Sequence, residues 1–244
     1  MIYVNGDSYS LSNGKNYGDY LSQLTSSKLL HKGIPGSSNT RIFRTTTRDL
    51  LKLKQAGVEK CLVCVGLSFW YRTEIWIEDH GIKKWYKFEF DDGEFASFQA
   101  ATNNDWWSAG PIPDDNLPRF YKNYLKEWVK TLNADAAITN TLYQASMLLH
   151  LCKSLGYHLI IFWAADVTQD IQRIDPNLDV LKDFYAEFDN SNSFDLLNYS
   201  FVNIYNKIRP PYDYDLYKEH GHPDTTSHKE FAEEIYNKWL IIQK

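Results

Sequence analysis

The chain has 244 residues, of which 43% are hydrophobic and 23% are charged, and its net charge is −5. This composition predicts a globular protein with a sizeable core, and the acidic balance argues against a general nucleic-acid binder, which is normally basic. No apolar run approaches the length of a membrane span, and the first residues lack the pattern of a secretion signal, so we expect a cytoplasmic protein without a membrane partner.

The first ten residues organise the rest of the chain. An apolar run of strand-forming residues starts at Ile2 and stops at Gly6-Asp7-Ser8. We expect this strand in the centre of a sheet, with Gly6 allowing a sharp turn because it has no Cβ. Ser8 then follows the carboxyl end of the strand, where open parallel sheets bind ligands. It is a candidate nucleophile if a base reaches it, although a capping serine in a loop has the same local sequence.

Strands and helices alternate over the next part of the chain. Residues 17–30 have the periodicity of a helix, and a short extended piece leads into a loop at 33–39 that is rich in Gly, Ser and Asn. A second helix is expected over 40–56, followed by a continuously apolar strand over 60–66 that runs into Ser68. This alternation predicts a parallel sheet, in which the loops after the strands open on one edge.

An aromatic-rich insertion at about 70–117 interrupts this pattern. Two alternating runs within it predict a hairpin from Glu74 to Asp91. We expect the insertion to leave the sheet at the active edge, with Trp70, Tyr71 and Arg72 contacting the substrate. Its aromatic side chains would stack on a sugar or line an acyl pocket, or else form a small core of the insertion itself.

The second half of the chain continues the alternation. Helical signals cover 117–156 and 167–197, a buried strand is expected at 158–163, and 201–205 is a candidate short strand. The last helix is expected over 227–240. The side chains expected to face inward from it are Phe231, Ile235 and Trp239.

The cysteines and histidines do not indicate a metal site, a disulfide framework or a cofactor. A spacing of three along a strand places Cys61 and Cys64 on opposite faces. We expect these two and Cys152 to be buried thiols. The histidines near the carboxyl terminus lack the fixed helical spacing of zinc ligands. They are His220, His222 and His228.

A doubly wound sheet would bring the three strand-end loops and the histidine-rich loop before the last helix to one cleft. That cleft would hold a serine, backbone donors and a histidine with a carboxylate beside it, which are the parts of a serine hydrolase. Two histidines compete for the role of base. His222 precedes Pro223 in an irregular loop, whereas His228 lies in the first turn of a helix, whose dipole disfavours an imidazolium. We therefore expect His222 to be the base and His228 to make a structural hydrogen bond.

The chain resembles the SGNH (GDSL-type) hydrolases. Gly6-Asp7-Ser8 matches the first block of that family, Gly36 matches the glycine of the second, and the segment from Glu219 to Pro223 matches the last. The segment 36–42 is similar to a branch seen in phage and bacterial members, so a phage-encoded chain would be virion-associated. The resemblance implies a single domain over 1–244 with a flavodoxin-like three-layer αβα sandwich around a parallel sheet.

The same resemblance implies the roles of individual residues. Ser8 would be the nucleophile, His222 the base and Glu219, in place of the usual aspartate, the acidic member of the triad. Gly36 would donate to the oxyanion. The third block lacks the asparagine of the family, and Ser68 or Asn39 would supply that donor instead. Loss of such a donor costs about 3 kcal/mol of transition-state stabilisation.

Three functions fit these features. The first is a serine esterase or deacetylase that acts on a small-molecule or glycan ester, such as an acylated carbohydrate, without metal or cofactor. The second is a catalytically weakened relative that binds a glycan or serves as a virion or surface component. The third is a flavodoxin-like domain that binds a phosphate ligand at the 33–39 loop, and it leaves Glu219 and His222 without a role.

Overall fold

The computed structural model describes residues 1–10, 15–70, 72–79, 82–91, 94–101, 133–164, 188, 201 and 223–242. In this part of the chain the fold is α/β, with a parallel sheet of four strands in the order β2-β1-β3-β7. The strands are β1 (Ile2–Asn5), β2 (Leu29–His31), β3 (Leu62–Leu67) and β7 (His158–Trp163). The first strand pairs with a neighbour on each side, which confirms the prediction that it lies inside the sheet.

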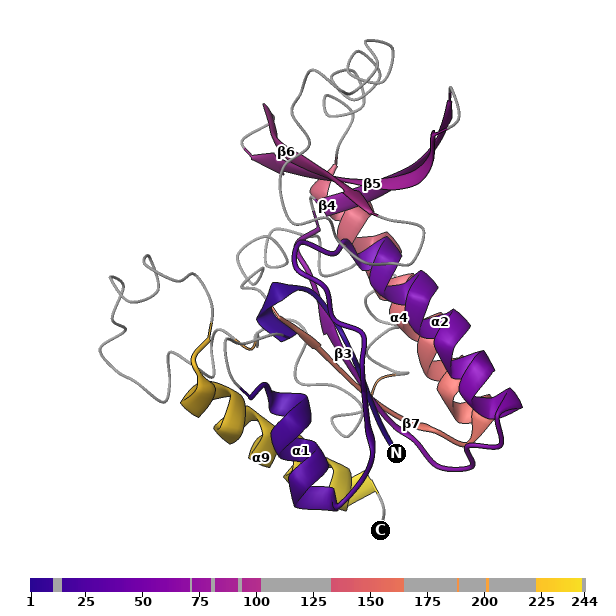
Figure 1. Ribbon diagram of the computed structural model, residues 1–244, viewed down its shortest axis with the longest axis vertical. Coiled ribbons are helices and arrows are strands. Elements are labelled where there is room, and N and C mark those ends of the chain that lie inside the picture. Colours follow the sequence, from indigo (N-terminus) through magenta and orange to yellow (C-terminus); the bar gives the residue numbers. More distant parts are fainter. Residues whose placement is uncertain are drawn as a thin grey trace.

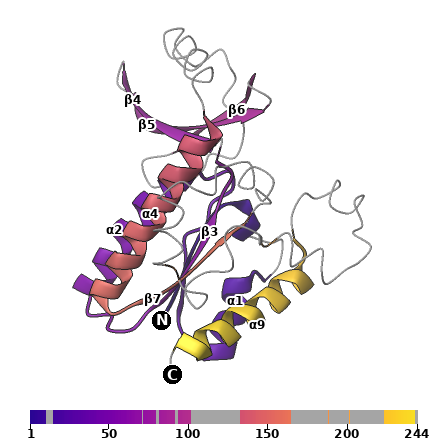
Figure 2. The ribbon, with the colours of Figure 1, turned by 180° about the vertical axis from the view of Figure 1, so that it is seen from behind.

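Helices cover both faces of the sheet, which gives three layers (Figures 1 and 2). One face carries α2 (Asn39–Gln55) and α4 (Ala134–Leu155), and the other carries α1 (Tyr17–Thr25) and α9 (Thr225–Ile242). This arrangement is compatible with the flavodoxin-like fold that we expected. Among the helices that the structure describes, none is both long and apolar enough to cross a membrane.

The first helix is shorter than its periodicity predicts. It begins at a capping box formed by Asn16 and Asp19 and ends at Ser26, which has the left-handed φ of 49°. The expected helix over 17–30 is therefore wrong at its end, because Leu29 and Leu30 pair with β1 as part of β2. A strand of three residues is too short to show its own periodicity, and the two leucines fit a helical pattern equally well.

The helices predicted over 40–56 and 227–240 and the strands predicted over 60–66 and 158–163 agree with the structure to within a few residues. The continuous helix expected over 117–156 is wrong at Asn133, whose extended backbone caps the start of α4. Ser38 caps α2, and Gly156, with a φ of 74°, ends α4 as expected. Residues 117–132 of the expected helix lie outside the described residues, as do most of 167–197 and of 201–205. Phe201 is described and is helical, so the strand expected there is wrong at that residue.

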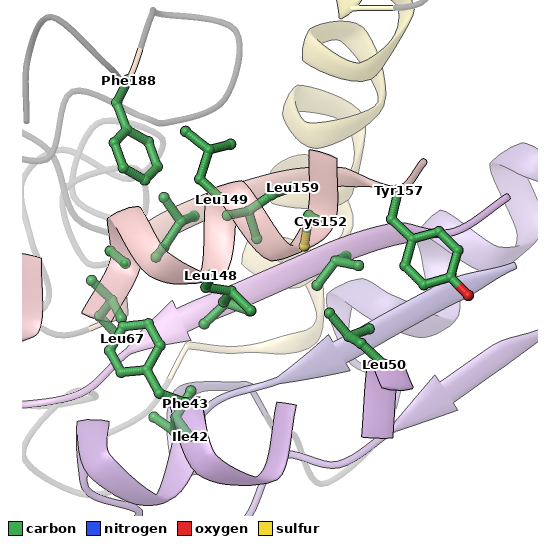
Figure 3. Close-up of a cluster of buried hydrophobic side chains, with 14 of the residues drawn as sticks. Ile42, Phe43, Leu50, Leu67, Leu148, Leu149, Cys152, Tyr157, Leu159 and Phe188 are labelled. Carbon is green, nitrogen blue, oxygen red and sulfur yellow. The ribbon is translucent and has the colours of Figure 1, made fainter. Parts of the chain in front are cut away.

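Two hydrophobic cores lie on opposite faces of the sheet. Figure 3 shows the core between the sheet and the α2–α4 layer, where Ile42 and Phe43 of α2 lie across from Leu148 and Leu149 of α4. The second core includes Tyr17, Leu21, Phe231 and Ile235 between the sheet and the α1–α9 layer. The prediction that Phe231 and Ile235 face inward is confirmed, and Trp239 is partly buried against the same core.

The cysteines follow the alternation of the sheet. Cys61 belongs to the core under α2 and α4, and Cys64 belongs to the core under α1 and α9. All three cysteines are buried and unbridged, as predicted. Burial raises the pKa of Cys61 to about 11, so this thiol stays protonated near neutral pH.

The part of the insertion that the structure describes forms an antiparallel sheet beyond the carboxyl ends of the parallel strands (Figure 1), and residues 102–117 lie outside the described residues. Its strands are β4 (Arg72–Asp79), β5 (Ile82–Asp91) and β6 (Glu94–Ala101). The predicted hairpin is confirmed by the pairing of β4 with β5. The third strand, β6, was not predicted, although Asp92-Gly93, which precedes it in the sequence, is a dipeptide typical of hairpin turns.

Candidate active site

The turn after β1 places Ser8 at the carboxyl edge of the sheet. Ser8 is half-buried and begins a short 3₁₀ helix, Ser8–Ser10. Gly6 has no positive φ, so a left-handed turn does not explain the glycine. A Cβ at Gly6 would instead collide with Ser10 Oγ and lie 3.1 Å from the carbonyl oxygen of Gly66. Close packing of the turn against the neighbouring strand therefore requires glycine at this position.

The residue before Ser8 is a fully buried carboxylate. Asp7 Oδ1 accepts a hydrogen bond from the backbone N–H of Tyr9 at 3.0 Å. Asp7 Oδ2 accepts from Ser68 Oγ at 2.7 Å and from Arg72 Nη1 at 2.9 Å. A buried charge needs such partners, because desolvation without them costs several kcal/mol. Asp7 therefore connects the turn of Ser8 to the loop that follows β3.

The loop after β2 lies against the same turn. The Ile34 N–H donates to the carbonyl oxygen of Gly6 at 3.1 Å, and the Ser37 N–H donates back to that of Ile34 at 3.2 Å. Pro35 and Gly36 occupy the two central positions of this turn, and Gly36 has a φ of 62°. Proline followed by a glycine at positive φ is the pattern of a type II turn. The glycine that we expected at the oxyanion position is thus required by the backbone.

Asn39 and Ser68, the other two oxyanion candidates, bind each other. Asn39 Nδ2 donates to the Ser68 carbonyl oxygen at 2.9 Å, and Asn39 Oδ1 accepts from the Ser68 N–H at 2.7 Å. The Ser68 hydroxyl accepts a hydrogen bond from Arg72 Nη1 at 2.9 Å and donates one to Asp7 Oδ2. In this arrangement both groups hold the β3 loop in place, and their role as oxyanion donors stays a prediction.

Buried polar residues under the edge were missed by the sequence analysis. Asn5 Nδ2 donates to Thr45 Oγ1 at 2.9 Å and to Thr46 Oγ1 at 2.8 Å, which fixes the end of β1 to α2. Arg41 is only 2% exposed, and its Nη1 donates to Ser37 Oγ at 3.2 Å in the β2 loop. The signal for Asn5 was a polar residue inside an apolar strand, since buried amides need partners.

His31 is a further residue at the edge that the sequence analysis did not single out. Its Nε2 lies 2.9 Å from the carbonyl oxygen of Ser10, and because a carbonyl only accepts, the nitrogen must carry the proton. Burial lowers the pKa of His31, against a smaller opposing effect of the hydrogen bond to Ser10. The imidazole therefore supports the far end of the Ser8 turn in its neutral form.

His228 has the structural role that we expected of it. It is fully buried in the first turn of α9, and its Nδ1 accepts a hydrogen bond from the backbone N–H of Tyr17 at 3.2 Å. Its ring stacks on that of Tyr17 and meets the edge of Phe201. Asp224 caps the same helix by accepting from the N–H of Ser227 at 2.8 Å. His228 thereby joins the starts of α1 and α9.

The remaining predicted site residues are placed in part. Trp70 is half-buried against the core under α2 and α4, and Arg72 lies beside Asp7. Glu219, His222 and Tyr71 lie outside the described residues, so the base and its carboxylate stay predictions. The described residues bring the turn of Ser8, the Gly36 loop and the Ser68 loop to one edge of the sheet.

Comparison with known proteins does not assign a family. A scan against protein-family models finds no match for the chain, and a search of curated protein sequences finds none either. The function must therefore be argued from the residues at this edge and from the chemistry that they permit.

Proposed function

We propose that this protein is a serine ester hydrolase with Ser8 as its nucleophile. The observation that carries the proposal is the construction of the turn around Ser8. Ser8 follows an interior parallel strand and is only half-buried, and the residues on either side of it, Asp7 and Tyr9, are buried. The Gly36 loop is hydrogen-bonded to Gly6 within that same turn. A serine supported in this way at the ligand-binding edge is typical of a nucleophile.

The proposed reaction proceeds through an acyl-enzyme. Ser8 Oγ attacks the ester carbonyl carbon while His222 takes the hydroxyl proton, and Glu219 orients the imidazole. The backbone N–H groups of Ser8 and Gly36 donate to the oxyanion of the tetrahedral intermediate. His222 then returns the proton to the leaving alkoxide, and the bond between the carbonyl carbon and the alkoxide oxygen breaks. Water then attacks the acyl carbon while His222 takes a proton from it, the bond between that carbon and Ser8 Oγ breaks as His222 returns the proton to Oγ, and the acid is released.

An acylated carbohydrate is the substrate class that we favour. The antiparallel sheet of the insertion leaves the domain at the edge that carries Ser8 (Figure 1), and its sequence is rich in aromatic residues. Aromatic rings provide flat apolar faces that suit a sugar ring or an acyl chain. The junction itself lies beside the nucleophile turn, because Arg72 at the start of β4 contacts Asp7.

A catalytically weakened, glycan-binding relative is the second candidate, and one observation favours it. The Ser68 hydroxyl donates a hydrogen bond to Asp7, and the Ser68 N–H donates one to the side chain of Asn39. Neither group then points a proton at a substrate in this arrangement. An oxyanion site without a third donor loses about 3 kcal/mol of stabilisation, or a hundredfold or more in rate. Binding without appreciable hydrolysis is the behaviour that this candidate predicts.

Hydrolysis assays separate the two candidates. We expect the wild-type protein to hydrolyse p-nitrophenyl acetate and acetylated sugars, and the Ser8→Ala variant to lose this activity. Ser154→Ala is the matched control, since Ser154 is exposed at the far end of α4 and donates to the Leu151 carbonyl of its own helix. Equal turnover by wild type and Ser8→Ala would contradict the first candidate. Binding of acetylated sugars without turnover would favour the second.

A further inference from the structure

We propose that Arg72 is a positioning residue for the nucleophile and acts on Ser8 through Asp7. This inference rests on the proposed function, and it gives a positioning role to a residue that the sequence analysis expected only to contact the substrate. Arg72 is the first residue of β4, so the proposal also assigns a task to the start of the insertion. The ion pair would join the antiparallel sheet of the insertion to the turn that carries Ser8.

The geometry of the ion pair is that of a buried, triangular contact. Arg72 Nη1 lies 2.9 Å from Asp7 Oδ2 and 2.9 Å from Ser68 Oγ, and Ser68 Oγ lies 2.7 Å from the same carboxylate oxygen. The side chain of Asp7 is 0% exposed, and that of Arg72 is 10% exposed. Water therefore screens this pair little, unlike a surface salt bridge.

The loop around Arg72 is shaped to hold the guanidinium in place. The Arg72 N–H donates to the carbonyl oxygen of Phe69 at 3.3 Å, which closes a turn between β3 and β4. The guanidinium carbon then lies 4.7 Å from the centre of the Phe69 ring, a cation–π contact. The Phe69 ring in turn meets the edge of Tyr9, two residues after Asp7. A planar guanidinium suits both contacts, whereas the lysine ammonium is a point charge.

The route from Arg72 to Ser8 is short. Asp7 Oδ2 is held by Arg72 and Ser68, while Asp7 Oδ1 is held by the N–H of Tyr9. The carboxylate thus bridges from the β3 loop to the residue on the other side of Ser8. Holding Asp7 at one end and Tyr9 at the other fixes the backbone between them. Removal of the guanidinium takes a cation 2.9 Å away from a buried carboxylate, and we expect the turn to rearrange in response.

The test uses a fluorophosphonate probe, which reports the reactivity of Ser8, together with kcat and KM for p-nitrophenyl acetate. All measurements are made well below the melting temperature of each variant. We expect Arg72→Gln to lower the labelling rate and kcat about 100-fold, the loss typical of a displacement of about 1 Å, with little change in KM. Arg72→Lys should fall between Arg72→Gln and wild type. Added guanidinium ion should partly restore labelling of Arg72→Ala.

Two further variants sharpen the test. Arg48→Gln is the matched control, because Arg48 forms an ion pair with Asp49 on α2 at 3.0 Å, away from the nucleophile turn. It should label at the wild-type rate. If Arg72 and Asp7 act as one unit, the double variant Asp7→Asn, Arg72→Gln should be no slower than the slower single variant, because coupled losses do not multiply.

The outcomes distinguish this inference from the proposed function. Slow labelling of folded Arg72 variants, with lysine and guanidinium restoring part of the rate, supports the positioning role. Wild-type labelling rates in folded Arg72→Lys and Arg72→Gln overturn it and leave the proposed function intact. If Arg72→Gln does not fold, the labelling rates of folded Arg72→Lys and Ser68→Ala decide instead. Ser68→Ala removes the hydroxyl that contacts both Arg72 and Asp7. A wild-type protein that is not labelled at Ser8 overturns the proposed function and this inference with it.

Discussion

The side-chain amide of Asn39 forms two hydrogen bonds with the backbone of Ser68. Asn39 Nδ2 donates to the carbonyl oxygen at 2.9 Å, and Asn39 Oδ1 accepts from the N–H at 2.7 Å. The pair links the first residue of α2 to the loop after β3. Both residues are buried, so each backbone group depends on the amide rather than on water. The loop that holds Asp7 is therefore itself fixed by Asn39.

Removal of this amide should destabilise the protein. In Asn39→Ala the Ser68 N–H and carbonyl oxygen would be left buried without their partner, at a cost of about 1–3 kcal/mol for each unsatisfied group. We expect a fall of about 2–4 kcal/mol in the free energy of unfolding, measured with urea. Asn133→Ala is the control, because Asn133 caps the exposed start of α4 and should cost only about 1 kcal/mol. Equal losses in the two variants would show that the Asn39–Ser68 pair contributes no more to the free energy of unfolding than an exposed helix cap does.

Alanine variants of His228 and His222 should differ in effect, because the first should lose stability and the second activity. His228→Ala removes the acceptor of the Tyr17 N–H and leaves a cavity among aromatic rings, so we expect a stability loss of about 2–5 kcal/mol. Esterase activity per folded molecule should stay close to wild type. His222→Ala should instead abolish activity at unchanged stability. Loss of activity in a well-folded His228→Ala would reverse the assignment of the base.

Gly36 should matter for activity beyond its effect on stability. Alanine at a φ of 62° costs about 1–2 kcal/mol, because the Cβ approaches the following carbonyl oxygen. Gly156 offers a matched control, since it has a φ of 74° and open space around its Cβ position at the end of α4. We expect both alanine variants to lose similar stability in thermal unfolding. Only Gly36→Ala should also slow hydrolysis, and an equal effect on activity would remove Gly36 from the site.

His31 should make stability depend on pH. Its folded-state pKa is lowered from 6.5 mainly by burial, so below pH 6.5 the unfolded chain binds more protons at this position than the folded one. Stability is then lost as the pH falls from 6.5 through the lower folded-state pKa. We expect His31→Gln to show a shallower loss than wild type over that window, measured as urea midpoints at several pH values. Parallel curves for the two proteins would mean that His31 does not titrate on unfolding.

The general plan of the fold could be predicted from the sequence because it depends on local patterns. The continuously apolar runs at β3 and β7 indicated buried parallel strands, and the three-residue spacing placed Cys61 and Cys64 on opposite faces. The end of α1 was wrong because Leu29 and Leu30 fit a helix and a three-residue strand alike.

The supports of the candidate site were not predictable in the same way. Ser8 stood out from its place after an apolar run. Asp7, however, owes its role to Arg72, which lies 65 positions along the chain. Neither periodicity nor spacing reports a contact between residues so far apart in sequence. The same is true of His228 and Tyr17, which are separated by 211 positions.

Reaction of Ser8 with a fluorophosphonate probe tests the central claim most directly. The labelled protein is digested, and the adduct is located by mass spectrometry in the peptide that contains Ser8, with Ser8→Ala as the negative control. Our account predicts a single adduct on Ser8 that is absent from the variant and suppressed in His222→Ala. An adduct on a different serine, or no adduct on the folded wild-type protein, would contradict the assignment of Ser8 as the nucleophile.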